Sequence, residues 1–185
     1  MKNTLLSFAL IFGAIALFTS CDDEIVIPNE EELITTLIYT LTPEGGGTPI
    51  EFKFTDLDGD GGNTPVVTSG ILDTNTTYNG QLTLLNESET PVEDITEEIE
   101  EEDEEHQFFF FSSLLSTNIS YNDMDSDGNP IGLATIVQTG EAGSGTLTIT
   151  LRHEPDKNAS GVSNGTITNA GGETDIEVEF DITIQ

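Results

Sequence analysis

The sequence predicts a mostly β domain, a two-layer antiparallel β-sandwich in the immunoglobulin-like or jelly-roll style, with one inserted acidic helix. From Leu33 onward, apolar residues recur mostly with a period of two, which is typical of half-buried strands. Clusters of Gly, Asn, Asp and Pro separate these segments and supply the turns. About eight short strands joined by polar turns favour two packed antiparallel sheets.

The N-terminal segment predicts a secreted, lipid-anchored protein. Residues 1–20 read as a lipoprotein signal peptide, with Lys2 as the positive region and Leu5–Phe18 as the apolar region. The only cysteine, Cys21, follows two small residues at the place where a bacterial lipoprotein is cut and acylated. We therefore expect lipidation at Cys21, which attaches the protein to a membrane. A buried or free thiol is the alternative.

The acidic segment after the cysteine predicts a tether. Residues 21–32 are acidic, contain Pro28 and show no sustained apolar period. We expect this segment to carry a single β-sandwich domain at residues 33–185. The acidic run at residues 22–24 resembles the signal that sends some lipoproteins to the outer face of the outer membrane, which favours the cell surface over the periplasmic face. The alternative interpretation is that these acidic residues only keep the tether solvated.

The net charge of the chain argues against nucleic acid as a partner. The chain has 35 acidic residues against four Lys and Arg, a formal net charge of −31. Removal of the signal peptide with Lys2 would leave Lys53, Arg152 and Lys157 as the only permanent cations of the side chains. Three scattered cations cannot neutralise a run of phosphates, so nucleic-acid binding is not expected. Such a charge favours a soluble monomer and attracts cations.

The expected strands follow from apolar periodicity. They cover, in chain order, residues 33–42, 50–55, 66–67, 78–84, 108–111, 119–121, 131–138, 146–153 and 175–185. The first two flank a glycine-rich turn and predict a hairpin. The last alternates most regularly, with Ile176, Val178 and the next alternate residues facing inward. Phe108–Phe111 has no polar side, which predicts a core strand, either buried on both faces or crossing beneath the acidic helix.

One helix is expected within the acidic region. Thr90–Glu93 fits a capping box with proline at the first helical position. Val92, Ile95 and Ile99 then form a narrow apolar stripe, while Glu97–Glu105 is otherwise acidic. Like charges four residues apart destabilise a helix by roughly a few tenths of a kcal/mol per pair, so we expect the second half to fray.

Two Asp-rich loops are candidate calcium sites. Both match D-x-D-x-D-G, which opens the calcium loops of EF-hand, dockerin and thrombospondin-type repeats. The candidate ligands are Asp56, Asp58, Asp60, Asp123, Asp125 and Asp127. An EF-hand loop ends with a glutamate at its twelfth position, but Val67 and Ala134 stand there in this chain. An Asp/Gly hairpin turn is the alternative interpretation.

The two histidines form a second candidate metal site. His106 follows Ile99 by seven residues on the predicted helix, and Glu102 lies one turn before it. His153 continues the inward face of the strand 146–153, at a sheet edge. The two histidines could therefore meet in space, and with Glu102 they could bind zinc or copper. Structural histidines at element ends are the alternative. No motif fixes a cofactor, and calcium at the Asp-rich loops or zinc at the histidines is the ion that the residues favour most.

Enzymatic activity is not expected. The only cysteine is assigned to lipid, no G-x-S-x-G motif occurs, and the carboxylates lie in runs or turns. A hydrolase is the alternative, although the sequence does not show which of its carboxylates would form a catalytic pair.

Four segments resemble an uncharacterised group of Bacteroidota outer-membrane lipoproteins. They are Thr48–Gly62, Glu97–Phe108, Leu151–Pro155 and Gly171–Asp175. Members of this group are often labelled "type 1 periplasmic binding fold superfamily protein". That label conflicts with the period of two, because type 1 binding proteins are long, two-lobed α/β structures. The resemblance implies a lipoprotein and assigns no residue roles.

These observations predict a non-enzymatic, lipid-anchored binding module of the cell envelope. Its ligand is not encoded in a motif, and its expected partners are the membrane, through Cys21, and an outer-membrane receptor that it would assist in nutrient or metal uptake. The alternative is a protein whose main function is to bind divalent cations.

Overall fold

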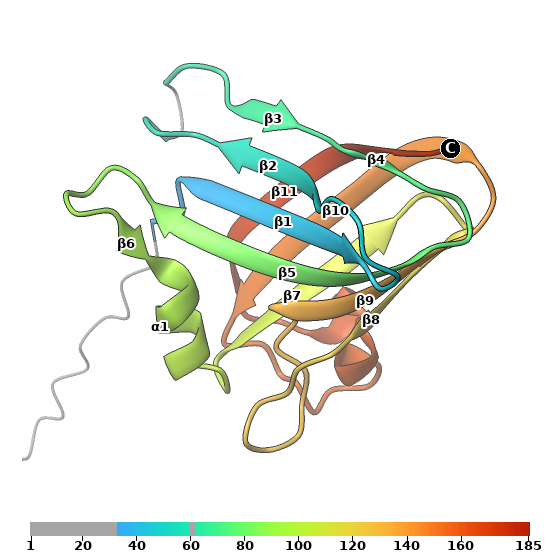
Figure 1. Ribbon diagram of the computed structural model, residues 1–185. Helices are drawn as coiled ribbons and strands as arrows, with labels where there is room; N and C mark the ends of the chain where they lie inside the picture. The colour runs from blue at the N-terminus through green and yellow to red at the C-terminus, as the bar shows by residue number, and fades with distance from the viewer. Residues whose placement is uncertain (1–32, 60–61) are drawn as a thin grey trace, which may run out of the picture. The chain divides into compact units, whose positions relative to one another are not determined.

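The computed structural model describes residues 33–59 and 62–185. The predicted signal peptide, Cys21, the tether and Asp60 lie outside the described residues. The described chain folds as a β-sandwich of two sheets, as predicted, and the sheets form the two layers seen in Figure 1. Every pairing between strands is antiparallel except that of the short strand β4 with β11.

The larger sheet contains seven strands. Its spatial order is β3 (Val66–Thr68), β2 (Ile50–Thr55), β1 (Thr36–Pro43), β5 (Thr77–Asn86), β9 (Ala134–Thr139) and β8 (Thr117–Tyr121), with β6 (Glu93–Asp94) paired to β5. The predicted hairpin of the first two long strands is confirmed, since Thr36 pairs with Thr55 and Leu41 with Ile50.

The smaller sheet contains four strands and provides the framework of the candidate site. Its order is β4 (Ile71–Leu72), β11 (Glu173–Ile184), β10 (Gly143–His153) and β7 (His106–Ser112). On β11, Val178, Phe180 and the alternate residues after them are buried, as the period of two predicts. Two short 3-10 helices, η1 (Val162–Asn164) and η2 (Ile167–Asn169), lie in the connection between β10 and β11.

The core lies between the two sheets. Each sheet contributes fully buried aromatic and aliphatic side chains, including Phe52 from the larger sheet and Phe180 from the smaller one. These two rings meet edge to face with centroids 5.7 Å apart, a favourable geometry for aromatic pairs. The Tyr39 hydroxyl is also buried in the core and shares a 2.6 Å hydrogen bond with Thr135 Oγ1.

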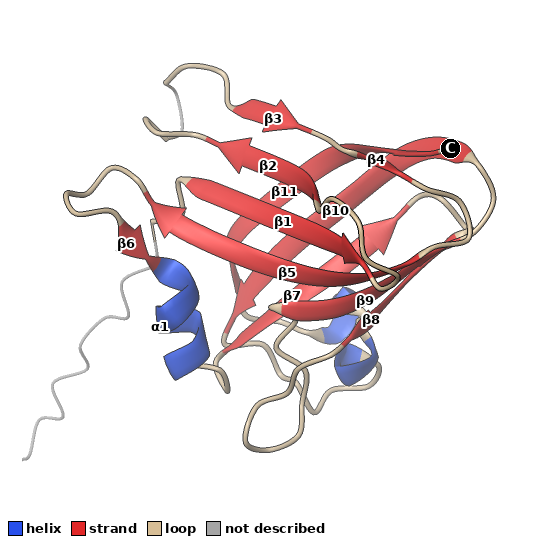
Figure 2. Ribbon diagram, in the orientation of Figure 1, coloured by secondary structure: helices blue, strands red, loops and turns tan. Residues whose placement is uncertain are grey.

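Helix α1 (Ile95–Glu101) begins later than predicted. The capping box at Thr90 is wrong, because Asp94 is the N-cap and accepts a 3.1 Å hydrogen bond from the Thr96 amide. Residues 93–94 instead pair with β5, which commits their backbone to a sheet. Val92 is 52% exposed and does not belong to the apolar stripe. Figure 2 shows α1 at the end of β5, apart from the two 3-10 helices.

The phenylalanine strand is buried on only part of its outer face. Phe108 lies in the main core, and Phe109, on the opposite face, is covered by Val162 and Ala170 from the connection between β10 and β11. This cover ends before Phe111, which is 66% exposed. The prediction that Phe108–Phe111 is buried on both faces is therefore wrong at Phe111.

Candidate metal centre

Strand pairing brings the two histidines together. His106 begins β7, His153 ends β10, and the two residues are direct partners in the register of these strands. Both are buried, and their ring centroids lie 4.7 Å apart at an interplanar angle of 41°. Direct partners in an antiparallel pair project their side chains to the same face, so this register fixes the proximity of the rings.

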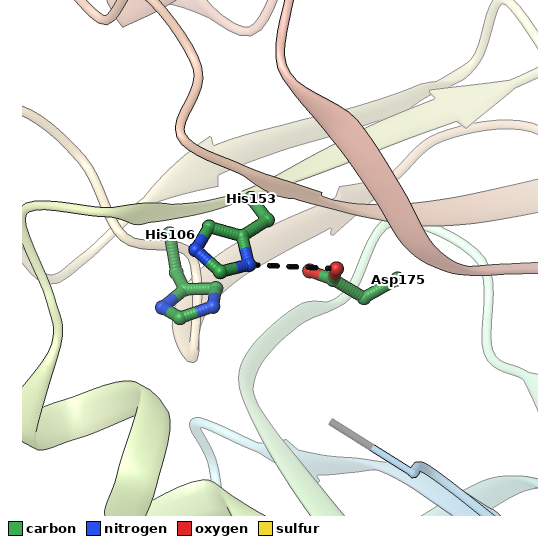
Figure 3. Close-up of side chains that lie close together, drawn as sticks. All are labelled: His106, His153 and Asp175. Carbon is green, nitrogen blue, oxygen red and sulfur yellow. Dashed lines mark ion pairs between the residues drawn. The ribbon is translucent and has the colours of Figure 1, made fainter. Parts of the chain in front are cut away.

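A β-bulge adds a carboxylate to the histidine pair. Leu151 pairs with Ile176 and Arg152 with Thr174, which leaves Asp175 as the extra residue of β11. A bulge interrupts the alternation of a strand and can turn an additional side chain toward the face of its neighbour. The side chain of Asp175 is 0% exposed, and Oδ1 lies 3.8 Å from His153 Nδ1. Figure 3 shows the Asp175 carboxylate facing the ring of His153.

The position of His106 differs from the prediction. His106 was expected on the acidic helix, but α1 ends at Glu101 and His106 belongs to β7. Beyond Ile99 the helix has no further apolar residue to bury, and consecutive carboxylates repel one another. Glu102 still contacts His106, through its backbone carbonyl oxygen at 3.1 Å from Nδ1, while its side chain is exposed.

The three side chains have the chemistry and spacing of a metal site. One ligand atom from each of His106, His153 and Asp175 can be chosen so that all lie within 4.8 Å of one another. The 3.8 Å separation between His153 and Asp175 exceeds a hydrogen bond. Two ligands at about 2.0–2.2 Å from one zinc ion can be that far apart. Because Glu102 contacts Nδ1 of His106, the Nε2 atom is the nitrogen that would bind the ion.

A second group of ligands surrounds the same histidine at the surface. Glu105, His153 and Glu154 also place ligand atoms within 4.8 Å of one another, and both glutamates are exposed. Glu105 Oε2 lies 3.8 Å from His153 Nε2. The Glu154 amide donates to the Glu105 carbonyl, which holds the two glutamates next to each other. His153 is therefore common to a buried group and to an exposed group.

In the first Asp-rich loop, the described carboxylates bind loop groups. Asp56 Oδ1 accepts a 3.0 Å hydrogen bond from the Gly59 amide, and Asp58 Oδ2 accepts from the amide and the side chain of Asn63. The hydrogen bonds from Asn63 lower the pKa of Asp58. These contacts are those of an Asp-stabilised turn.

In the second Asp-rich loop, a lysine from a distant part of the chain pairs with a carboxylate that would otherwise be expected to bind a metal cation. Both oxygens of Asp123 accept backbone amides, from Gly132 at 2.8 Å and Ala134 at 2.7 Å. Asp125 Oδ1 accepts from the amides of Asp127 and Asn129, while Oδ2 lies 2.9 Å from the buried ammonium of Lys157. Among the described residues, the carboxylates of neither Asp-rich loop join a group of three converging ligands.

Sequence reasoning missed Asp175 and Lys157. Asp175 directly precedes the regularly alternating part of β11, in a position that the pattern assigns to the outward face, so the sequence gives no sign of an inward carboxylate. Lys157 lies 32 residues after its partner Asp125 and belongs to no motif. The small number of Lys and Arg residues is the signal that could have identified Lys157. A chain with only four such residues has few cations to pair with its buried carboxylates.

Two hollows lie on either side of Gly165. One, of about 370 Å³, is bounded by Phe110, residues 119–121 and residues 163–165. The other, of about 310 Å³, lies against Phe109–Phe111 and residues 165–168. Neither lining contains a charged residue, and burial raises the pKa of Tyr121 to about 12, so its hydroxyl stays neutral.

Comparison of the chain with protein families, curated proteins and solved structures finds no match. Within the described part of the chain, no helix combines the length and apolarity needed to cross a membrane.

Proposed function

We propose that this protein is a lipid-anchored envelope protein whose β-sandwich binds a divalent transition-metal ion. The observation that carries the proposal is the buried convergence of two imidazoles and one carboxylate, His106, His153 and Asp175, at the end of the smaller sheet. Imidazole and carboxylate ligands suit zinc and copper, and three protein ligands leave a coordination position for water or another ligand.

The electrostatics of the site support a bound cation. A carboxylate with no exposed surface needs a compensating positive charge, because an isolated buried charge is very costly. Either a protonated imidazole or a metal ion would supply this charge beside Asp175. The net charge of −31 also raises the local concentration of cations around the protein.

Zinc titration of the acylated or soluble domain tests this proposal. Micromolar zinc should raise the midpoint of thermal unfolding, since an ion that binds only the folded state stabilises it. His153→Gln and Asp175→Asn should each remove most of this shift. Asp181→Asn is the matched control, because Asp181 lies on the same strand with its side chain exposed. Equal zinc shifts in the Asp175 and Asp181 variants would contradict the proposal.

The lipid anchor is proposed from the sequence alone. Support comes from the apolar segment Leu5–Phe18 and the single cysteine that follows it. Cys21→Ser should abolish incorporation of labelled fatty acid and move the protein from the detergent phase to the aqueous phase. Unchanged labelling in that variant would exclude acylation at Cys21. Protease treatment of intact cells, compared with lysed cells, tests exposure on the outer face of the outer membrane.

A second binding function is supported by the hollows beside Gly165. In a chain rich in acids, two neighbouring hollows lined by aromatic, hydroxyl and amide groups favour an uncharged ligand. Such a ligand would fit the expected role as an accessory of an outer-membrane receptor. Ser163→Trp, which would place a large side chain in the hollow of about 370 Å³, should abolish ligand binding there without changing the zinc shift. Retention of a ligand's affinity in this variant would place its site elsewhere.

A further inference from the structure

His153 has an acidic group on each side of its ring. Nδ1 lies 3.8 Å from Asp175 Oδ1, and Nε2 lies 3.8 Å from Glu105 Oε2. The two nitrogens of an imidazole point away from each other, so one metal ion cannot bind both of them. The buried and the exposed ligand groups therefore correspond to two separate positions that share one ring.

We propose that the site binds two transition-metal ions, with the ring of His153 as a bridge between them. This inference rests on the proposed metal-binding function. The inner ion binds His106, Nδ1 of His153 and Asp175. The outer ion binds Nε2 of His153, Glu105 and Glu154.

Charge balance favours two ions over one. An inner dipositive ion bound by one carboxylate and two neutral imidazoles would leave a net positive charge in a buried position, which is unfavourable. Two dipositive ions are instead neutralised by three carboxylates and one imidazolate. The bridging ring reaches the imidazolate form by releasing its remaining N–H proton to solvent as the second ion binds, and no electron is transferred.

The burial of the ligands predicts different properties for the two positions. The inner ligands are buried, and the contact between His106 Nδ1 and the Glu102 carbonyl orients one of the rings. The outer position has exposed glutamates, with the Glu105 side chain 55% exposed, so water completes its coordination. We therefore expect the outer ion to bind more weakly and to exchange faster.

Copper binding to the full domain tests the bridge, because Cu²⁺ ions can be counted and their coupling observed. Equilibrium dialysis should give two bound Cu²⁺ ions per chain, the second with lower affinity than the first. Two Cu²⁺ ions joined by one imidazolate couple antiferromagnetically, so the low-temperature EPR signal should fall well below that of two isolated ions. The double variant E105Q/E154Q should bind one ion and show a normal single-ion spectrum. E97Q/E100Q, which changes two exposed glutamates of α1, is the matched control and should retain both ions.

The outcomes separate this inference from the proposed function. One uncoupled ion in the unmodified protein, unaffected by E105Q/E154Q, would overturn the bridge and leave the inner site intact. No bound ion would overturn both, and would assign His153 to an ion-paired structural role between Asp175 and Glu105. Two uncoupled ions whose number is unchanged by E105Q/E154Q would also overturn the bridge, because the second ion would then bind elsewhere.

Discussion

Lys157 shows how one side chain can replace a metal ion in a loop. Its ammonium is buried, lies 2.9 Å from Asp125 Oδ2 and donates to the carbonyl of Asp103. Asp103 lies in the turn that leads to His106, so this lysine joins the second Asp-rich loop to the start of β7. The loop has the sequence of a calcium site, but an internal cation already compensates its buried carboxylate.

Substitution of Lys157 should therefore be costly. Lys157→Met would leave Asp125 as a buried charge without its cation, and breaking such a pair typically costs about 3–5 kcal/mol of stability. Urea unfolding at neutral pH measures this loss. Adding Asp125→Asn to the same chain should recover part of it, because the uncompensated charge is then removed. Equal stability of the single variant and the unmodified protein would mean that the backbone amides alone stabilise the carboxylate.

The same ion pair predicts a pH dependence in acid. Burial alone would raise the pKa of Asp125, but the hydrogen bond and charge of Lys157 and the amides of Asn129 and Asp127 together lower it. A lowered pKa in the folded state means that the stabilisation is complete above the ordinary aspartate pKa of about 4 and is lost as the pH falls through the lowered folded value.

Urea unfolding between about pH 6 and pH 2 measures this effect. The unmodified protein should be more stable than Asp125→Asn at about pH 6, and the difference should shrink below about pH 4 as the carboxylate becomes protonated. Asp127→Asn is the control in the same loop, because Asp127 is exposed. A difference that stays constant across this range would show that the charge of Asp125 does not contribute to stability.

At the scale of elements, the turn before β11 packs directly against the end of β10. Gly172 has a φ of +66°, and a Cβ atom there would lie 2.1 Å from the carbonyl oxygen of His153. Its neighbour Gly171 has a similar φ of +63° but has open space around a Cβ. The close approach of Gly172 therefore holds the chain of His153 near the bulge that presents Asp175.

Alanine substitutions at Gly171 and at Gly172 separate the strain of a left-handed backbone from the effect of the close contact with His153. Gly171→Ala should cost only the strain of a left-handed alanine, roughly 1 kcal/mol. Gly172→Ala should cost more, because it must also move the end of β10, and it should weaken zinc binding through the displaced His153. Thermal unfolding with and without zinc measures both effects. If the two variants lose the same stability and zinc affinity, the close contact does not position the histidine.

The elements that the sequence predicts well are those whose periodicity continues without interruption. β10 and β11 follow the alternation of apolar residues, and the inward parity of β10 places His153 on the same face as Leu151. The predicted sheet edge is wrong, because β10 lies between β11 and β7. The bulge breaks this parity at Asp175, and it leaves no trace in the sequence because the regular alternation begins only at Ile176. The two histidines of the candidate site could thus be predicted, while the carboxylate of Asp175 could not.

The helix illustrates competition between local and tertiary signals. Thr90–Glu93 has the residues of a capping box, but pairing of residues 93–94 with β5 takes precedence. The helix then begins where Thr96 Oγ1 accepts the Leu84 amide at 2.9 Å, a contact between distant segments that no local pattern encodes. Because the helix starts late and ends at Glu101, His106 falls in a strand opposite His153 rather than on a helix face.

At the scale of the whole molecule, the net charge of −31 opposes folding by repulsion among carboxylates. Screening should relieve this repulsion, since the Debye length falls from about 30 Å at 0.01 M salt to about 8 Å at 0.15 M. We expect sodium chloride over this range to stabilise the domain by roughly 1 kcal/mol, which corresponds to about 2–4 °C in the unfolding midpoint of a chain of this size.

The response to zinc should differ from this general screening. Micromolar zinc hardly changes the ionic strength, so any shift that it causes must come from bound ions. His153→Gln should keep the full response to sodium chloride, because the net charge is almost unchanged, and should lose the response to zinc. Thermal unfolding of both proteins in the two salts tests this separation. Loss of both responses in the variant would point to a damaged fold, whereas retention of both would place the zinc ions among the surface carboxylates instead of the histidine site.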